Sequence, residues 1–123
     1  MKVTCGTDII EIERIKNSID KLGEKFLNKV FTAKEIQYCE SKNKQKYQHY
    51  AARFAAKEAI FKALSTRIIS EYSWLDFEVL NDDSGKPKIF LNTKINNLDD
   101  IDISISHCKN YAVATVIAIF KEK

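Results

Sequence analysis

Cysteine is scarce in this sequence: only Cys5, Cys39 and Cys108 occur among 123 residues. Their number is odd, they lie far apart and no C-x-x-C is present, so the spacing fits neither a disulfide framework nor a zinc knuckle. The first residues lead straight into a strand pattern, without the apolar run of a signal peptide. We therefore expect three free thiols in a reducing compartment and a cytoplasmic protein.

Long apolar runs and a strong charge excess are also missing. No run approaches the roughly 18 apolar residues that would indicate a membrane span. The 20 basic and 17 acidic residues give a net charge of +3, which fits an anionic ligand but is too small to argue for bulk nucleic-acid binding. There is no internal repeat or low-complexity segment, so we expect residues 1–123 to form one domain with a modest core.

The first third of the sequence predicts one short strand followed by helical segments. Residues 3–9 are β-branched and predict a strand that is broken at Gly6. Apolar residues then recur every three or four positions, so a helix should begin near residues 8–10 and end at Gly23, with a short helical piece after it. Thr32 and Glu35 form a capping box that should start a further helix.

Residues 50–64 predict a central helix that is apolar around most of its circumference and therefore lies inside the fold. The lysine-rich residues 41–48 before it predict a connection or a solvated helix end. Four alanines form a small-residue ridge that would let another element approach the central helix closely: Ala51, Ala55, Ala59 and Ala63.

The rest of the chain is rich in β-formers. Strand patterns occur at residues 74–79, 88–91, 101–106 and 111–120. The first two flank a turn signal and predict a hairpin, whereas residues 93–98 predict a weak helix. Helices followed by strands favour an α+β fold, in which a mostly antiparallel sheet packs against the long central helix.

Glu58 is a carboxylate at a position where an ordinary buried helix carries an apolar residue. At about 100° per residue its neighbours on the helical wheel are mostly apolar, apart from Lys62 one turn later. A buried charge whose partner is missing costs roughly 3 to 5 kcal/mol. Two interpretations are open: a structural pair with Lys62, or a metal ligand beside a phosphate-binding lysine.

Asp8 lies where the predicted strand gives way to a helix, so it either caps that helix or faces Glu58. Two carboxylates that meet repel, and then either one takes up a proton or a divalent cation sits between them. Oxygen ligands with room for water and phosphate suit Mg²⁺. The other charged groups are open as well: a lone histidine such as His107 is more often packed or solvated than catalytic, and Arg53 and Lys57 either supply cations to the site or are solvated.

In order and type, the local patterns resemble the small phosphopantetheinyl transferases of the holo-acyl-carrier-protein synthase type. The resemblance runs from Gly6 to about Ala114, and its central-helix motif is highly specific. The matching segments are Gly6-Thr7-Asp8 with Arg14, Phe31-Thr32-Ala33-Lys34-Glu35, Arg53 to Ala63, Gly85-Lys86-Pro87 and Ser106-His107. There are two departures from the family pattern: Ser65-Thr66-Arg67 replaces the usual glycines, and Cys108 replaces a small hydroxyl residue.

The resemblance implies transfer of 4′-phosphopantetheine from coenzyme A to a serine of apo-acyl carrier protein, in support of fatty acid biosynthesis. Adenosine 3′,5′-bisphosphate would be the by-product. It implies Mg²⁺ held by Asp8 and Glu58, with Glu58 and Lys62 as the catalytic residues. The implied coenzyme A site consists of Arg53, Lys62, Gly85, Lys86, Pro87 and His107.

In such a reaction the serine hydroxyl attacks the β-phosphate, so positioning and electrostatic stabilisation dominate. The base is either a metal-linked carboxylate or a water near Glu58, and the sequence leaves both open.

The same resemblance implies two kinds of protein partner. The first is further copies of the chain, in a homotrimer with active sites between protomers that the apolar closing strand and the alanine ridge would hold together. The other is an acidic carrier protein that would dock on a basic face formed by Arg14, Lys21 and Lys25 together with Lys16. The alternative for the lysines is a solvated helix face, whereas Arg14 matches the family position.

A rival interpretation is a non-enzymatic RNA-binding module. Tyr47 and Tyr50 would stack on bases beside a basic patch. The patch would consist of Lys42, Lys44, Lys46, Arg53 and Lys57. This interpretation leaves Asp8 and Glu58 unexplained. A more distant superfamily member that serves another carrier protein is the second alternative.

Overall fold

Two antiparallel sheets and one long helix form the centre of the computed structural model, which describes residues 1–64 and 72–121. The larger sheet has the strand order β1-β5-β4, and the smaller is the hairpin β2-β3. Their bounds are β1 (Lys2–Glu11), β2 (Phe77–Asn81), β3 (Pro87–Leu91), β4 (Leu98–His107) and β5 (Tyr111–Phe120). The α+β class is confirmed, and the predicted single sheet is divided into two.

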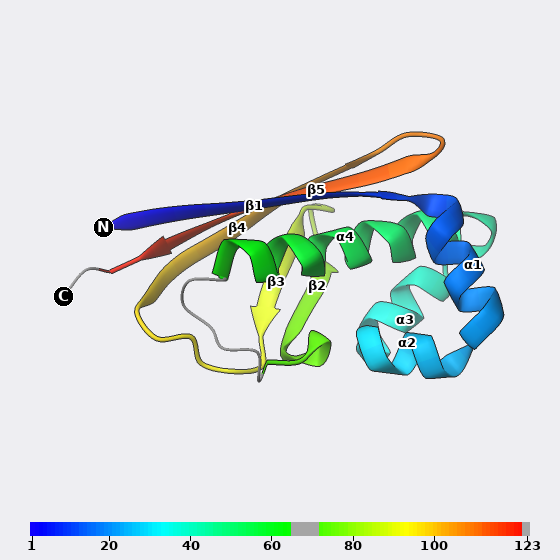
Figure 1. Ribbon diagram of the computed structural model, residues 1–123, viewed down its shortest axis with the longest axis horizontal. Coiled ribbons are helices and arrows are strands. Elements are labelled where there is room, and N and C mark those ends of the chain that lie inside the picture. Colours follow the sequence, from blue (N-terminus) through cyan, green and yellow to red (C-terminus); the bar gives the residue numbers. More distant parts are fainter. Residues whose placement is uncertain (65–71, 122–123) are drawn as a thin grey trace.

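The long helix α4 (Lys46–Leu64) runs along the three-stranded sheet (Figure 1). Three shorter helices gather around its N-terminal end: α1 (Ile12–Leu22), α2 (Glu24–Val30) and α3 (Ala33–Glu40). Two 3₁₀ turns complete the order, η1 (Asn43–Gln45) before α4 and η2 (Trp74–Asp76) before β2. Among the helices of the two described ranges, none is long and apolar enough to cross a membrane.

Local chemistry explains the helix boundaries that the sequence predicted correctly. Gly23 ends α1 with a φ of +60°, a conformation that glycine adopts without steric cost. The capping box of α3 is present, because the Thr32 hydroxyl accepts from the Glu35 N–H and the Thr32 N–H donates to Glu35 Oε1. The strand at Tyr111–Phe120 and the hairpin are also confirmed.

The strand β1 corrects the predicted start of the chain. It runs unbroken through Gly6 and reaches Glu11, so α1 begins at Ile12 rather than near residues 8–10. Glu11 occupies the N-cap position, and the suggested capping role of Asp8 is therefore wrong. Gly6 is needed for packing, because a Cβ there would collide with the carbonyl oxygen of Ala59 on α4.

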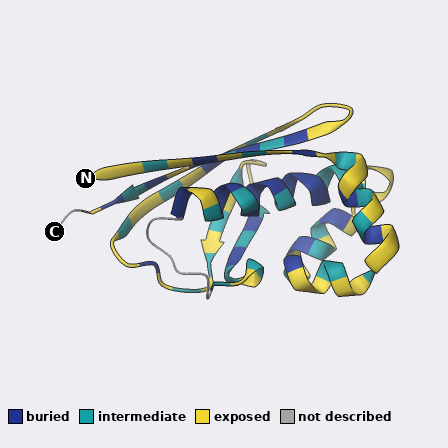
Figure 2. Cartoon of the chain, in the orientation of Figure 1, coloured by how far each residue is buried: buried dark blue, intermediate teal, exposed yellow. Residues whose placement is uncertain are grey.

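The alanine ridge of α4 faces this close contact. Figure 2 shows α4 as mostly buried, and all four ridge alanines are at most 1% exposed. The ridge is used inside the chain, so the expectation that it joins protomers of a trimer is wrong. Two further predictions are corrected: α4 begins at Lys46 rather than 50, and residues 93–97 form an irregular connection with a turn instead of a helix, with Leu98 already in β4.

Candidate active site

The two predicted carboxylates meet between β1 and α4. Asp8 lies on the face of β1 that carries Gly6, and its side chain is only 19% exposed. Glu58 is half-buried on α4. Both line one cavity of about 300 Å³, together with Arg14 and an apolar wall that includes Phe26 and Phe54. The tight packing of Gly6 on α4 therefore brings a strand carboxylate next to a helix carboxylate.

This setting disfavours a second negative charge. Burial is the main cause that raises the pKa of Glu58 above its ordinary value, and the charge of Asp8 raises it further. Lys62 opposes both effects. A carboxylate in such a place gains from a nearby cation, because the cation offsets the lost hydration and the repulsion.

Lys62 supplies one such cation at the rim. Its ammonium lies 3.2 Å from Asp8 Oδ1 and donates to the Thr7 carbonyl at 2.9 Å. Its side chain is still 54% exposed, so it can reach a ligand that enters from solvent. Lys62 acts on both carboxylates, whereas the structural alternative from the sequence had it pair with Glu58 alone.

The donor set fits a hard divalent cation that shares its coordination sphere with a ligand. In residues 1–64 and 72–121 there is no group of three or more His, Cys, Asp or Glu that could hold a metal. Asp8 and Glu58 would therefore supply two oxygen donors, and water or phosphate oxygens would supply the rest. Mg²⁺ is commonly bound in this way, by one or two carboxylates plus substrate phosphates.

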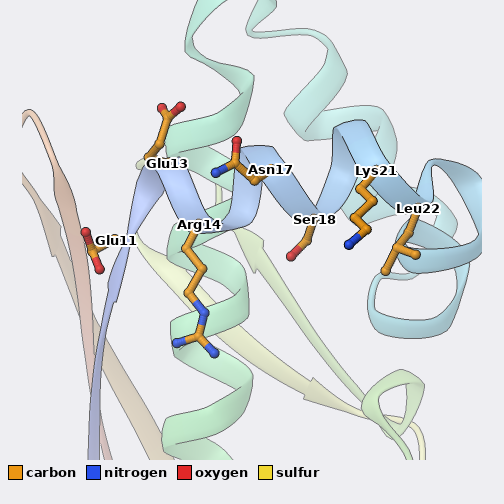
Figure 3. A pocket seen from close by; sticks show the side chains of 7 residues that line it. All are labelled: Glu11, Glu13, Arg14, Asn17, Ser18, Lys21 and Leu22. Atoms are coloured by element: carbon orange, nitrogen blue, oxygen red, sulfur yellow. The ribbon is translucent and has the colours of Figure 1, made fainter.

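Arg14 connects the acid cavity to a groove on the outside of α1. Figure 3 shows its side chain extending from α1 alongside α4. Arg14 is exposed, and it lines both the cavity that holds Asp8 and a neighbouring groove of about 550 Å³. The groove is lined by Glu11, Glu13, Arg14, Asn17, Ser18, Lys21 and Leu22 (Figure 3). A macromolecule bound along α1 could thus reach the carboxylates past Arg14.

The other cations of the predicted basic face are arranged less uniformly. Lys21 lines the groove, and Lys25 is exposed at the start of α2 without lining it. The ammonium of Lys16 lies 5.8 Å from the ring centre of Tyr47, away from the groove. The groove also contains two glutamates, so its charge is mixed rather than purely basic.

Arg53 is almost fully buried, which excludes the interpretation of a solvated charge. Its Nε donates to the Val79 carbonyl at 3.1 Å and its Nη2 to Asn81 Oδ1 at 3.2 Å. The guanidinium also lies 4.2 Å from the ring centre of Tyr38. Arg53 thus ties α4 to β2 and α3, and its predicted contact with coenzyme A stays a prediction.

The remaining predicted coenzyme residues lie away from the acid cavity. Gly85, with a φ of +86°, Lys86 and Pro87 form the tip and start of the hairpin strand β3, where Lys86 Nζ lies 3.2 Å from Asp102 Oδ1. His107 is exposed at the end of β4 and lines a separate cavity of about 220 Å³ beside Cys108. Within one chain, none of these residues lines the cavity of Asp8 and Glu58. The departures at Ser65, Thr66 and Arg67 lie outside the described residues.

Three contributors to this region were not singled out from the sequence. Phe26 and Ser18 line the acid cavity, and the Thr7 carbonyl receives the ammonium of Lys62. The apolar period of α1 and α2 marks their buried faces, but it carries no signal for which residues border a cavity between elements. A backbone carbonyl carries no sequence signal at all.

Comparisons with known proteins identify the family of the chain. The family model of the 4′-phosphopantetheinyl transferase superfamily matches residues 4–116. The chain is 48% identical to a holo-[acyl-carrier-protein] synthase of Ruminiclostridium cellulolyticum, over 95% of this chain and 92% of that relative. It is 46% identical to the synthase of Thermoanaerobacter sp. strain X514, over 100% of this chain and 91% of the relative.

Solved structures of holo-acyl-carrier-protein synthases have the same fold as this chain. A holo-(acyl-carrier-protein) synthase from Bacillus anthracis in complex with CoA (3′,5′-ADP) superposes with a TM-score of 0.79, at 40% identity over 94% of both chains. The Helicobacter pylori synthase in complex with coenzyme A reaches a TM-score of 0.81, at 32% identity over 94% of this chain and 99% of that chain. With its acid cavity, its central-helix motif and these matches over nearly its full length, the chain belongs to the 4′-phosphopantetheinyl transferase superfamily.

Proposed function

We propose that the protein transfers 4′-phosphopantetheine from coenzyme A to a serine of apo-acyl carrier protein, releasing adenosine 3′,5′-bisphosphate. The observation that carries the proposal is the convergence of Asp8, Glu58 and Arg14 on one cavity, in a chain whose relatives are holo-acyl-carrier-protein synthases. The product would be a holo-acyl carrier protein that serves fatty acid biosynthesis. The same chemistry on another carrier protein is the alternative that the experiment below distinguishes.

The chain's own residues would bind the pyrophosphate and orient the attacking serine. Asp8 and Glu58 would hold Mg²⁺, which when bound supplies a positive centre that stabilises charge on phosphate oxygens. Lys62, at the exposed rim of the pair, would neutralise charge on the pyrophosphate. Glu58, whose pKa is raised by burial and by Asp8, or a water beside it, would take the serine proton.

The acidic carrier protein would dock along α1. The groove there meets the acid cavity at Arg14 and is also lined by the exposed Lys21, and Lys25 is a further exposed cation at the start of α2. Positive charge on such a rim acts mainly on the rate of association with an acidic partner. The two groove glutamates would restrict the carrier to one orientation, because they repel acidic groups locally.

A homotrimer would complete the coenzyme site. Several large side chains on the face of the main sheet away from α4 are strongly exposed, among them Ile9 at 64% and Val3 at 56%. Tyr111 and Ile117 of β5 add to this apolar face. Its burial between protomers would bring the His107 end of one sheet toward the acid cavity of a neighbour. The assembly would then place His107 of one protomer close to Asp8 and Glu58 of another, although these residues lie apart within a single chain.

A cytoplasmic location is part of the proposal. The three cysteines are free thiols, which suits a reducing compartment. The RNA-binding alternative loses its support, because Arg53 and Lys57 are buried and cannot contribute to a surface patch.

Mass spectrometry of apo-carrier protein incubated with the enzyme, coenzyme A and Mg²⁺ tests the proposal. We expect a mass increase of one phosphopantetheine group, and none when the acceptor serine is replaced by alanine. A second apo-carrier protein, from a polyketide or peptide synthase, measures the range of acceptors. Faster modification of that protein than of the fatty acid carrier would reassign the substrate, and no modification of any carrier would refute the transferase function.

A further inference from the structure

A second charged pair joins Glu35 of α3 to Lys57 of α4, the residue before Glu58. The side chains of Glu35 and Lys57 are both completely buried, and Lys57 Nζ lies 2.7 Å from Glu35 Oε1. The same ammonium donates to the Val30 carbonyl at 2.7 Å and to the Trp74 carbonyl at 3.0 Å. An ammonium has three protons to donate, so these three acceptors satisfy it completely.

The carboxylate side of the pair is satisfied as well. Glu35 Oε1 accepts from the Thr32 N–H at 2.8 Å, which is half of the capping box of α3. Glu35 Oε2 accepts from the Val79 N–H at 2.7 Å, on strand β2. The pair therefore joins the end of α2, the start of α3, η2 and β2 to one point on α4.

That point sets the position of Glu58. Lys57 and Glu58 are consecutive in a continuous helix, so a rotation or a slide of α4 that moved Lys57 would move Glu58 with it. On the other side of α4, Gly6 of β1 lies against Ala59 with no room for a Cβ. The helix is thus held on two faces within three residues, and Glu58 lies between the two contacts.

The third acceptor of the ammonium extends this effect to the wall of the acid cavity. The Trp74 carbonyl holds η2 against α4, and the Trp74 ring stacks on Phe54 with centroids 5.2 Å apart. The same ring meets Phe61 edge to face at 5.5 Å. Phe54 and Phe61 stand one turn before and after Glu58 on α4, and Phe54 lines its cavity.

We propose that the buried Glu35–Lys57 pair positions Glu58 for metal binding and catalysis. The inference rests on the proposed function, and it makes Glu35 and Lys57 positioning residues that touch neither substrate nor metal. Outer groups that orient metal ligands change affinity or activity by about 10- to 100-fold when they are replaced. A catalytic group displaced by about 1 Å costs a similar factor of about 100.

The test uses a variant that removes both charges, Glu35→Gln with Lys57→Met, so that no lone charge is left buried. Tyr50→Phe is the matched control, because Tyr50 is also fully buried on α4 and donates to Glu40 at 2.6 Å, two turns before Glu58. Each variant is made in wild type and in Glu58→Gln. Mn²⁺ binding is measured without coenzyme, and kcat and KM are measured with coenzyme A and carrier protein.

We call the double variant Glu35→Gln with Lys57→Met the neutral-pair variant. We expect it to bind Mn²⁺ more weakly and to have a kcat lower by about tenfold or more, with a smaller change in the KM for coenzyme A. In the Glu58→Gln background the same replacement should lower the remaining Mn²⁺ affinity and rate by less than about threefold. The effects of substitutions at coupled residues are not additive, and the pair has no Glu58 carboxylate to position in this background. Tyr50→Phe should change both backgrounds equally and little.

Full additivity in the two backgrounds would overturn the proposal, as would wild-type Mn²⁺ affinity and kcat in the neutral-pair variant. If that variant does not fold, Glu35→Asp decides the matter, because it keeps both charges and shortens one arm by a methylene. It should reduce Mn²⁺ affinity in wild type and not in Glu58→Gln. A wild type that binds Mn²⁺ but modifies no carrier protein would refute the transferase function and leave the binding arm to test the positioning role.

Discussion

Two consecutive residues of α4, Lys57 and Glu58, each face a charged side chain of another element, and the two pairs are built in opposite ways. Glu35 and Lys57 have opposite charges, no exposure, and a partner for every proton and both oxygens. Asp8 and Glu58 have like charges and line a cavity, and the pKa of Glu58 is raised first by burial and then by the charge of Asp8. We call Glu35–Lys57 the closed pair, because all its polar groups have partners within the chain and it stabilises the fold. We call Asp8–Glu58 the open pair, because its repulsion is not fully compensated and the cavity leaves room for a cationic ligand.

The largest effect should come from the open pair. Asp8→Ala and Glu58→Ala should each lower phosphopantetheine transfer by about a thousandfold or more, because they remove donors that act on the charge of the transition state. Steady-state rates at limiting Mg²⁺ measure this, and Asp99→Ala is the control, since Asp99 lies in an exposed pair with Lys121. Near-wild-type turnover in either alanine variant would disprove the metal assignment.

The open pair should also cost stability in the absence of metal. Because the folded state raises the pKa of Glu58, it binds this proton more readily than the unfolded chain, so stability falls as pH rises above the ordinary carboxyl range. Glu58→Gln removes this cost and should leave the metal-free protein at least as stable as wild type at neutral pH. The midpoint of urea unfolding at neutral pH, measured without metal for wild type and for Glu58→Gln, checks this prediction, and a lower midpoint for Glu58→Gln would contradict it.

Breaking the closed pair should lower the stability of the protein, whereas neutralising Glu58 should not. Lys57→Met leaves the Glu35 carboxylate buried without its cation and should lower the free energy of unfolding by about 3–5 kcal/mol. Lys121→Met is the control, because its pair with Asp99 is exposed and should be worth about 0–1 kcal/mol. Urea titration measures both, and a loss of under about 1 kcal/mol for Lys57→Met would mean that the pair is not a structural tie.

Lys62 sharpens the contrast, since it is the exposed lysine of the two. Lys62→Ala should reduce kcat by about 10²–10³-fold through loss of charge compensation at the pyrophosphate, with little loss of stability. His107→Ala, which lines a different cavity, should reduce kcat less. Single-turnover rates and urea midpoints separate the two effects, and a larger kcat loss in the histidine variant would contradict the role of Lys62.

Arg14 borders both the acid cavity and the groove on α1, so it tests where the open pair meets its partner. Arg14→Glu should raise the KM for carrier protein about tenfold at low salt and change the KM for coenzyme A little. The difference from wild type should narrow as salt is added, because the Debye length is about 8 Å at physiological ionic strength. Parallel increases of both KM values would place Arg14 in the catalytic pocket instead.

The smallest effect concerns His49, a titratable group on α4 that belongs to neither pair. Burial lowers its pKa to about 4, and Arg53, Lys42 and His107 contribute in the same direction. The unfolded chain takes up this proton near pH 6.5 and the folded chain only near pH 4, so stability falls as pH drops through that window. His49→Gln should flatten this part of the stability curve, measured by urea unfolding at a series of pH values. An unchanged slope would assign the acid sensitivity to other groups.

Local chemistry made much of the fold predictable. The capping box at Thr32, the glycine stop at Gly23 and the alternation in the closing strand each depend on neighbouring residues, and each was confirmed. The predicted start of α1 is wrong because the three- and four-residue apolar spacing begins at Ile9, which still lies in β1. The predicted strand break is also wrong, because Gly6 lies inside the continuous strand. The role of Gly6 is to let β1 contact α4, and that long-range contact leaves no trace in the local pattern.

The site followed a similar division. Glu58 could be found because a carboxylate interrupts an apolar arc, and the family motif supplied its partner Asp8. Lys57 was described as a cation that serves the site or is solvated, because a helical wheel shows which residues share a face but not what covers that face. Its burial depends on α2, α3 and η2, which converge on α4 only in the folded chain.

The pairing of β1 with β5 has a consequence for the synthesis of this protein. Thr7, the neighbour of Asp8, donates through its hydroxyl to the carbonyl of Ala114, 107 residues later, and β5 lies between β1 and β4. A nascent chain cannot give Asp8 its place until β5 has been translated, because β1 has no other strand to pair with in the described sheet. Truncated translation products that lack β5 are therefore expected to carry Glu58 without its partner carboxylate, and to be catalytically silent rather than partly active.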